Sequence, residues 1–363
     1  MKHIGSVRED LSIEKRVSIT PEIIKKFIDL GFYINLEKKY AEHLGINDDN
    51  YKKNGVNIDF SKKEVFEKSD IILAVNCPSI SEVDLIKSKS ILIGQFDSNI
   101  NKDAINKLIK NNVIIFSLNL LPRITRAQSM DVLSSQANLA GYKAVIESFS
   151  TFEKAIPMMM TAAGTIPATK VLVIGAGVAG LQAIATAKRM GAIVFATDVR
   201  AAAKEQVESL GGKFLMVENS DNLETEGGYA KETSEEFKKK QEELLSETLK
   251  KIDIVICTAL IPGKKAPLII KENMIKNMKP GTLIFDLAAS QGGNAAFTQT
   301  DKIIDKNGVK IIGERNILNK LPISASNLYA KNLFNFVLNL YDKENNKINI
   351  NLEDEIINKT LIK

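Results

Sequence analysis

The chain has 363 residues, a formal net charge of +5 at pH 7 and 44% hydrophobic residues, which is enough for two domains with separate cores. Its lysines are scattered along the sequence, and this argues against a nucleic-acid surface. The two histidines, His3 and His43, have no companions at metal-ligand spacing, so we expect no metal site. We find no secretory signal pattern and no apolar stretch near the roughly twenty residues that a membrane span requires.

Residues 1 to about 120 alternate between strand and helix patterns, which predict a first α/β domain. Helical periodicity runs from 21 to 30 and from 102 to 110. Three apolar runs predict buried strands: Ile71–Val75, Ile91–Gly94 and Val113–Phe116. Cys77 and Cys257 both lie at the ends of apolar strand-like runs, and we expect buried, reduced thiols, which are typical of a reducing compartment.

The stretch Arg126–Phe152 has helical periodicity, and we expect it to link this domain to the next one. Gln128, Asp131 and Ser134 recur every three residues, which places them on one face of a helix, and Arg123 stands just before it. Hydrogen-bonding groups gathered on one side suit a ligand that carries an amide and hydroxyls. A solvated helix face explains the spacing alone equally well.

A nucleotide-binding βαβ unit follows, in the run T-K-V-L-V-I-G-A-G-V-A-G and the residues after it. The apolar strand Val171–Ile174 ends in the glycine motif, and a helical pattern leads to a second strand that ends in Asp198. Gly175 permits the tight turn, Gly177 lets the backbone approach a pyrophosphate, and Gly180 lets the helix pack on the strand. The N-terminus of that helix offers N–H groups and a positive dipole end to phosphates.

Asp198 also bears on which dinucleotide would bind. A carboxylate at this distance from the glycines accepts a hydrogen bond from the 2′-hydroxyl of NAD and repels the 2′-phosphate of NADP. Arg200 weakens the distinction, because an arginine can pair with that phosphate. With the acid in the primary position, the sequence favours NAD(H).

The segment 218–241 is long and charged where a short connection is expected, and it holds Gly227 and Gly228 beside Tyr229. These residues suggest a mobile lid over a bound nucleotide, and a disordered acidic loop is the alternative. Later apolar runs predict further strands, and a last helical pattern is expected to return to the first domain: 252–257, 282–287 and 309–312 for the strands, and 325–341 for the helix. The polar, asparagine-rich tail after it suggests no chemistry.

The fold class that these elements predict is α/β, with two Rossmann-like domains whose parallel sheets are flanked by helices. The first domain comprises residues 1–125 and 325–363. The second comprises residues 126–324, with a mobile loop near 218–241. A cofactor is expected in the cleft between the two domains, at the carboxyl ends of the strands.

Five segments carry a family resemblance that spans essentially the whole chain: R-I-T-R-A-Q-S-M-D-V-L-S-S-Q-A-N-L-A-G-Y, V-L-V-I-G-A-G-V-A-G-L-Q-A, T-D-V-R-A-A, G-G-Y-A-K-E and T-A-L-I-P-G-K-K-A-P. In these segments the chain resembles the NAD(H)-binding component of proton-translocating nicotinamide nucleotide transhydrogenases, in the bacterial form with a split alpha subunit. That family shares ancestry with alanine dehydrogenase.

The resemblance implies a set of site residues. The residues that match the positions holding the nicotinamide end of the cofactor are Arg123, Gln128, Asp131 and Ser134. Gln128 and Ser134 would bond the carboxamide and the ribose, and Arg123 would pair with Asp131. The residues that match the rest of the cofactor-binding segments are Gly175, Ala176, Gly177, Val178, Ala179, Gly180, Asp198, Val199, Arg200, Tyr229, Thr258, Ala259 and Leu260.

The activity that the resemblance implies is direct hydride transfer, of the Si-face type, from NADH on this chain to NADP⁺ on a partner subunit. It also implies membrane subunits, namely the other half of the split alpha subunit and the beta subunit with its NADP(H)-binding domain. These couple the transfer to proton translocation, and without them the chain is inactive. The chain would form a homodimer and lie in the cytoplasm, attached to the inner membrane through those partners. Such a transfer requires two nicotinamide rings in contact and no proton donor.

An alanine dehydrogenase or a related amino-acid dehydrogenase is the first alternative. Its family keeps an arginine near the N-terminus, a lysine, a histidine and an aspartate before a Gln-Gly-Gly. Arg16 matches the arginine, and we expect it to make helix-cap or loop contacts. Ala74 stands in place of the lysine, no histidine occurs near Phe96, and Ser290 replaces the aspartate. Because three of the four substrate groups are missing, the sequence argues against amino-acid chemistry.

A regulatory module that senses NAD(H) without turnover is the second alternative. The glycine motif alone would fit such a protein. A sensor needs to hold only the adenosine half of the cofactor, however, and the group from Arg123 to Ser134 faces the nicotinamide end in the resemblance above. That group therefore favours an enzyme.

Overall fold

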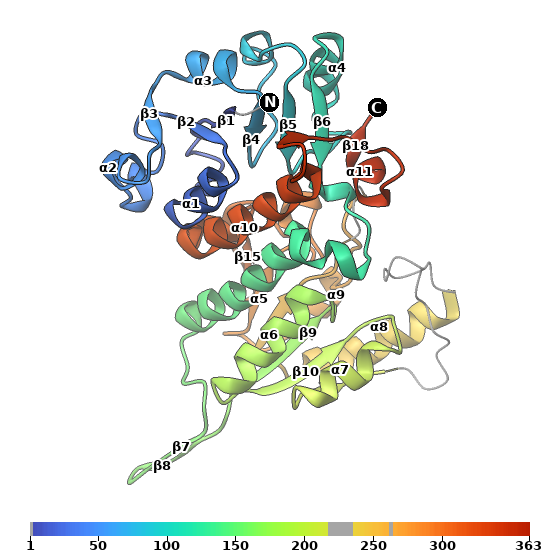
Figure 1. Cartoon of the computed structure of the whole chain (residues 1–363). Coiled ribbons are helices and arrows are strands. Elements are labelled where there is room, and N and C mark those ends of the chain that lie inside the picture. Colours follow the sequence, from blue (N-terminus) through green and yellow to red (C-terminus); the bar gives the residue numbers. More distant parts are fainter. Residues whose placement is uncertain (1–2, 217–234, 261–263) are drawn as a thin grey trace. The chain divides into compact units, whose positions relative to one another are not determined.

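The structure is a computed structural model that describes residues 3–216, 235–260 and 264–363 (Figure 1). The chain forms two compact units. Unit 1 comprises residues 1–136 and 318–363, and unit 2 comprises residues 137–317. The sequence pattern predicted boundaries near 125 and 325, whereas the first boundary of the structure falls within a helix, α5 (Val132–Thr151).

Unit 1 is built on a seven-stranded sheet in the order β18-β6-β5-β4-β1-β2-β3. The strands are parallel except β18, which pairs antiparallel with β6 at one edge. Their bounds are β1 His3–Ser6, β2 Tyr33–Glu37, β3 Asn57–Phe60, β4 Ile71–Leu73, β5 Ile91–Gly94, β6 Ile114–Ser117 and β18 Leu361–Ile362. The order 3-2-1-4-5-6 that remains without β18 is that of a Rossmann fold.

Helices and short 3₁₀ turns connect these strands. The α-helices of unit 1, apart from the start of α5, are α1 Pro21–Asp29, α2 Asp48–Lys52, α3 Lys62–Lys68, α4 Lys102–Lys110, α10 Pro322–Leu340 and α11 Glu355–Thr360. The 3₁₀ turns are η1 Glu42–Leu44, η2 Val83–Leu85, η3 Leu118–Leu120, η4 Thr125–Met130 and η6 Ile317–Lys320. A small hairpin, β16 (Tyr341–Asp342) with β17 (Lys347–Ile348), follows α10.

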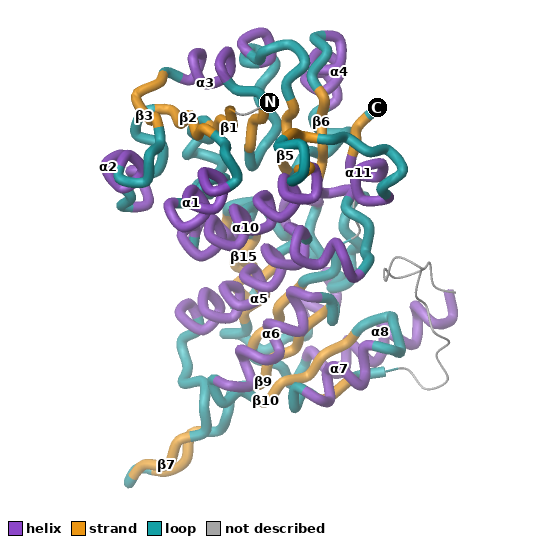
Figure 2. The backbone as a smooth tube through the Cα atoms, in the orientation of Figure 1, coloured by secondary structure: helices purple, strands orange, loops and turns teal. Residues whose placement is uncertain are grey.

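Alternate residues of each buried strand enter two apolar layers, one on each face of the sheet. In β4, Ile71 and Leu73 join the cluster that α1 and α10 cover, and Ile72 joins the cluster under α3 and α4. The helices that cover these faces are purple and the strands are orange in Figure 2. α10 contributes apolar side chains at helical spacing, including Tyr329 and Leu333, both fully buried.

Unit 2 has a second seven-stranded sheet, in the order β11-β10-β9-β12-β13-β15-β14. It is parallel except for the edge strand β14, and without that strand it again runs 3-2-1-4-5-6. Its strands are β9 Lys170–Ile174, β10 Ile193–Thr197, β11 Lys213–Phe214, β12 Ile254–Cys257, β13 Leu283–Asp286, β14 Lys302–Lys306 and β15 Val309–Gly313. Its helices after α5 are α6 Val178–Arg189, α7 Ala203–Ser209, α8 Glu235–Leu249 and α9 Glu272–Lys276, with a 3₁₀ turn η5 at Ala289–Gln291.

The core of unit 2 follows the same two-layer principle. Val171 and Val173 of β9 pack with Ala183 and Ile184 of α6 on one face of the sheet. Leu172 and its neighbours pack on the other face, where α8 and α9 contribute. The two sheets and their helices confirm the predicted α/β class and its Rossmann-like domains.

An exposed two-stranded arm leaves unit 2 ahead of β9. It consists of β7 (Met159–Thr161) and β8 (Gly164–Ile166), paired antiparallel (Figure 1). Its apolar side chains are solvent-exposed, with Met158 63% and Met160 81% exposed. Exposed methionines on a projecting hairpin are unusual, because burial would stabilise them.

The predicted helix Arg126–Phe152 is wrong in one respect, because it is not continuous. The 3₁₀ turn η4 ends at Met130, Asp131 has an extended conformation, and α5 begins at Val132. The cause is the carboxylate of Asp131, whose two oxygens accept hydrogen bonds from the backbone N–H (2.9 Å) and the hydroxyl (2.5 Å) of Ser134. Asp131 therefore caps a new helix instead of continuing an old one.

Other features complete the comparison with the sequence. The asparagine-rich tail, for which no elements were predicted, forms α11 and the edge strand β18. Both cysteines are free thiols: Cys257 is buried as predicted, and Cys77 is only half-buried. Within the described residues, no helix has the length and apolarity to cross a membrane.

Candidate dinucleotide site

The carboxyl ends of β9 and β12 form the topological switch point of the second sheet. Strands β10 and β11 follow on one side of β9, and β12, β13 and β15 follow on the other. Ligands of doubly wound α/β sheets bind at this position, because the loops after the two central strands leave in opposite directions. The glycine motif follows β9, and Thr258 follows β12, so both predicted segments lie at this edge of unit 2.

Three glycines shape the turn after β9, each in the way the sequence predicted. Gly175 has a φ of +91°, which a side chain would strain. A Cβ at Gly180 would lie 1.8 Å from the carbonyl oxygen of Gly175, so only glycine lets α6 approach the turn. A Cβ at Gly177, by contrast, would have no heavy atom within 4 Å. Gly177 therefore borders open space where a pyrophosphate fits.

The helix α6 begins directly after this turn, with Gly177 at its N-cap. Its first residues, Val178 and Ala179, bring their backbone N–H groups to the edge of the sheet, where the helix dipole favours an anion. Helix α5 packs tightly against this first turn, since a Cβ at Gly141 would lie 2.0 Å from the carbonyl oxygen of Ala179. The N-terminus of α6 is thus held in place by close backbone packing.

Asp198 follows β10 and reaches back to the glycine turn. Its Oδ2 accepts a hydrogen bond from the backbone N–H of Ala176 at 2.7 Å. Arg200 folds over the same carboxylate and donates from Nε to Oδ1 and from Nη2 to Oδ2, each at 2.9 Å. The Asp198 side chain is only 8% exposed. Burial alone would raise the pKa of Asp198, but the hydrogen bonds from Arg200 and from the Ala176 backbone hold it below its usual value.

The segment after β12 is fixed to the glycine turn and to a buried asparagine. Thr258 donates its hydroxyl to the carbonyls of Ile174 (3.1 Å) and Gly175 (2.9 Å). The next residue, Ala259, donates its N–H to Oδ1 of Asn294 (3.1 Å) and accepts from Nδ2 of Asn294 (2.9 Å). Leu260 is exposed. Asn294 itself is fully buried and was not predicted, although it directly follows the Gln-Gly-Gly motif.

The predicted lid lies largely outside the described residues. Tyr229 and the paired glycines before it fall among residues 217–234, which the structure does not describe. The last stretch of the predicted loop, from Glu235, belongs to helix α8 instead. Val199, from the other predicted segment, lies between Asp198 and Arg200 at the end of β10 and is half-buried.

The second group of predicted residues belongs to unit 1. Gln128 lies in η4 and is exposed, whereas Asp131 and Ser134 are half-buried and bonded to each other across the start of α5. Arg123 is exposed in the loop that precedes η4. The three residues at intervals of three therefore do not share one helical face, because the chain changes conformation at Asp131. What the structure does bring together is a capped helix start that presents an amide, a carboxylate and a hydroxyl.

Arg16 is buried, but it is neither a helix cap nor a loop tie. Its Nε and Nη2 donate to the two carboxylate oxygens of Glu14, each at 2.8 Å. Its Nη1 donates to Gln95 after β5 (3.1 Å) and to Gln136 of α5 (3.0 Å). The guanidinium also lies over the ring of Tyr329, 5.4 Å from its centroid. Arg16 is thus the centre of a buried polar junction.

The positions that an amino-acid dehydrogenase would use are apolar here. Ala74 and Phe96 are both buried in the apolar cluster between the first sheet and α4. Ser290 is exposed in the turn η5. Nor do the described ranges bring together three or more histidine, cysteine or acidic side chains that could hold a metal ion.

Comparisons with known proteins agree along the whole chain. Residues 5–140 match the alanine dehydrogenase/PNT N-terminal domain, and residues 144–363 match the corresponding C-terminal domain. The first of the two chains that make up NAD(P) transhydrogenase subunit alpha in Rhodospirillum rubrum is 48% identical over 356 residues, covering 96% of this chain and 93% of that protein. The protein of the same name from Rickettsia prowazekii is 44% identical over 363 residues, covering 99% and 94%. The crystal structure of a transhydrogenase from Sinorhizobium meliloti superposes with a TM-score of 0.90 at 43% identity, covering 99% of this chain and 98% of that one.

Proposed function

This chain belongs to the alanine dehydrogenase/PNT family, and from that membership we propose that it is the NAD(H)-binding component of a proton-translocating transhydrogenase. In this proposal NADH bound here passes a hydride directly to NADP⁺ on a partner subunit, with Si-face stereochemistry. Membrane subunits, the other half of the split alpha subunit and the beta subunit, couple the transfer to proton translocation. The chain itself lies on the cytoplasmic side of the inner membrane and is held there by those partners.

One observation carries the proposal: the dinucleotide-binding edge of unit 2 is complete, while the positions that would bind an amino acid are not. Asp198, the glycine turn and the N-terminus of α6 supply a ribose acceptor and a phosphate-binding end. Positions 74 and 96 hold buried apolar side chains that can neither donate a proton nor bind a carboxylate. Hydride exchange between two nicotinamide rings needs no such groups.

The residues of this chain would then bind and orient a substrate and perform no acid–base chemistry. NADH, as the substrate, supplies the hydride. Asp198 accepts the adenosine ribose hydroxyl, and the N–H groups of Val178 and Ala179 face the pyrophosphate. Gln128 bonds the carboxamide and Ser134 the nicotinamide ribose, which selects the face of the ring that is presented. Arg123 and Asp131 complete this neutral, internally balanced group, and Tyr229 closes over the cofactor.

A homodimer is part of the proposal, and the arm β7–β8 supports it. The arm carries Met158 and Met160 into solvent, far more exposed than is usual for methionine. A second copy of the chain is the occupant that the family resemblance favours.

The direct test is hydride transfer from NADH to an acetylpyridine analogue of NADP⁺, with and without the NADP(H)-binding partner subunit. NADH binding is first confirmed by calorimetry. Transfer only in the mixture is the expected result, because the second ring is held by the partner. Transfer by this chain alone, or no transfer in the mixture despite NADH binding, would contradict the proposal, and 2-oxo acids with ammonium would then be the next substrates.

Gln128→Asn separates the enzyme from a sensor of NAD(H). Shortening this side chain should lower the transfer rate about tenfold or more while the Kd for NADH changes by about threefold or less, because the amide orients the ring. Gln206→Asn, an exposed glutamine of α7, is the matched control. If Gln128→Asn leaves both quantities at their wild-type values, the assignment of Gln128 fails.

A further inference from the structure

The junction between η4 and α5 is held by one side chain of the C-terminal helix α10. Asn332 is only 7% exposed. Its Nδ2 donates to the backbone carbonyl of Ser129 at 2.8 Å, and its Oδ1 accepts from the hydroxyl of Ser135 at 2.7 Å. The donor therefore contacts the chain before Asp131 and the acceptor contacts it after Asp131. A single amide bridges the break.

This bridge matters because the backbone hydrogen bonds of a helix do not span the junction. Asp131 is extended, with φ −72° and ψ 90°, so the orientation of η4 relative to α5 must be set by side chains. The capping bonds of Asp131 to Ser134 fix only the start of α5. Ser129 directly follows Gln128, and Ser135 directly follows Ser134. Asn332 thus fixes the neighbours of both residues at once.

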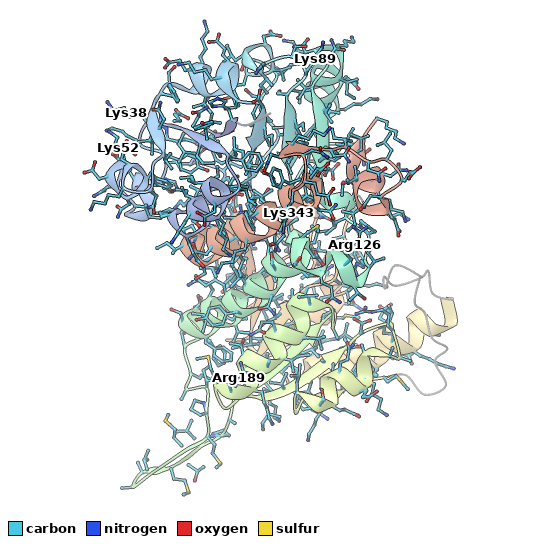
Figure 3. The ribbon with its side chains drawn as sticks, viewed as in Figure 1. Lys38, Lys52, Lys89, Arg126, Arg189 and Lys343 are labelled. Carbon is cyan, nitrogen blue, oxygen red and sulfur yellow. The ribbon has the colours of Figure 1, made fainter. Side chains whose placement is uncertain are left out.

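The face of α10 that carries Asn332 is directed at this junction along its length. Asn335, one turn further on, donates to the same carbonyl of Ser129 at 3.0 Å. Asn339 accepts from Arg126 of η4 (3.1 Å), whose guanidinium also pairs with Asp354 at 2.7 Å; Arg126 is labelled in Figure 3. The spacing of three and four places the asparagines on one helical face. Of these three asparagines, Asn332 is the one that bonds both sides of the break.

We propose that Asn332 is a positioning residue, which sets the orientation of Gln128 relative to Ser134 and thereby that of the nicotinamide end of the cofactor. The inference rests on the proposed function, since it assumes that these two residues bond the nicotinamide and its ribose. Asn332 does not touch the cofactor itself. It acts through Ser129 and Ser135, and both of its polar atoms are used for that purpose.

Calorimetric titration with two ligands tests this role without a partner subunit. NADH engages both ends of the proposed site, whereas ADP-ribose lacks the nicotinamide ring and reports only the adenosine and pyrophosphate end. We expect Asn332→Ala to weaken NADH binding about fivefold to tenfold, the effect of losing one well-formed hydrogen-bonded arrangement. The Kd for ADP-ribose should stay within about twofold of the wild-type value.

Three further variants make the test specific. Ser135→Ala removes only the acceptor end of the bridge, and it should weaken NADH binding about twofold to fourfold with ADP-ribose unchanged. The double variant Asn332→Ala/Ser135→Ala should be no weaker than Asn332→Ala alone, because both changes break the same bridge. Asn335→Ala, which bonds Ser129 but not Ser135, is the matched control and should stay near wild type. Should Asn332→Ala fail to fold, Ser135→Ala alone decides the matter.

The outcomes are distinguishable. Equal weakening of NADH and ADP-ribose would reduce Asn332 to a general structural role, and unchanged binding of both would remove any role. Either result overturns the inference and leaves the proposed function intact. If the wild-type chain binds neither ligand, the proposed function fails first.

Discussion

Among the described residues, four hydrogen bonds converge on the carboxylate of Asp198, three of them from Arg200 and one from the backbone of Ala176. A carboxylate has room for about four such bonds, so an incoming ribose hydroxyl must share or displace one of them. The arginine that was a candidate partner for a 2′-phosphate is instead paired with the acid. Selectivity for NAD(H) then has two causes, repulsion by Asp198 and the engagement of Arg200.

Asp198→Ala should therefore change the preference between dinucleotides. We expect NADH binding to weaken about tenfold, because a charge-assisted hydrogen bond is lost. NADPH binding should improve, since the guanidinium of Arg200 is released to face a 2′-phosphate. Titration of both cofactors measures the ratio. The control is Asp198→Ala/Arg200→Ala, which should bind both weakly, and tighter binding of NADPH than NADH by the wild-type chain would reject the assignment outright.

Glu9 carries a pH dependence of stability. Burial, together with the nearby carboxylate of Glu14, raises the pKa of Glu9 to about 7, although backbone N–H groups of Val75 and Asn76 donate to it. The folded state thus holds a proton that the unfolded chain, with a pKa of 4.5, has released. The stability linked to this proton is fully present below pH 4.5 and is lost as the pH rises through about 7.

Glu9→Gln mimics the protonated acid and should remove this dependence. The variant is expected to gain at most about 3 kcal/mol over wild type at pH 8 and almost nothing at pH 4.5. Urea unfolding of both proteins at the two pH values measures the difference. A stability difference that is the same at both values would show that Glu9 titrates normally.

At the scale of single elements, the glycine turn and helix α6 make opposite demands on two glycines of one motif. Gly180 is required for packing, since a Cβ there would meet a backbone carbonyl at 1.8 Å. Gly177 faces open space, so the fold does not need it. A structural glycine and a ligand-binding glycine are thus distinguishable within three residues.

Alanine substitutions should separate these two roles. Gly180→Ala is expected to destabilise unit 2 by about 3 kcal/mol or more through overpacking. Gly177→Ala should change stability by about 1 kcal/mol or less yet weaken NADH binding about tenfold, because the new methyl group occupies the path of the pyrophosphate. Thermal unfolding and calorimetry are measured on both variants. Loss of stability in Gly177→Ala, or wild-type stability in Gly180→Ala, would contradict the division.

How much of each element was predictable depended on where its determining contacts lie. The glycine turn, Asp198 and the central strands follow local patterns, and they are confirmed. The break at Asp131 was missed because apolar periodicity continues across it, although an aspartate three residues before a serine is a helix-start signal. Asn332 and Asn294 were beyond reach, since their partners lie more than thirty residues away in sequence. The strand β18 has only two residues, too few for a pattern.

At the scale of the whole molecule, the arm β7–β8 is the feature that a single chain does not explain. Light scattering should give the mass of two chains for the wild type. Met158→Ser/Met160→Ser should weaken the association by roughly 3 kcal/mol, the burial free energy of two methionine side chains. Ile100→Ser, at a residue 82% exposed in unit 1, is the matched control. A wild-type chain with the mass of a monomer would rule out the proposed homodimer.

Each unit also contains one thiol, and the two differ in how reagents reach them. Burial, with the Glu9 carboxylate nearby, raises the pKa of Cys77 to about 12, and burial in β12 raises the pKa of Cys257 well above its usual value. Alkylation requires an exposed thiolate, so Cys257 reacts only when the central strand of unit 2 separates from its neighbours. The labelling rate of Cys257 then measures the opening equilibrium of unit 2, and that of Cys77 measures local opening of unit 1. Without any engineered probe, the chain carries a separate chemical reporter of local unfolding in each of its two units.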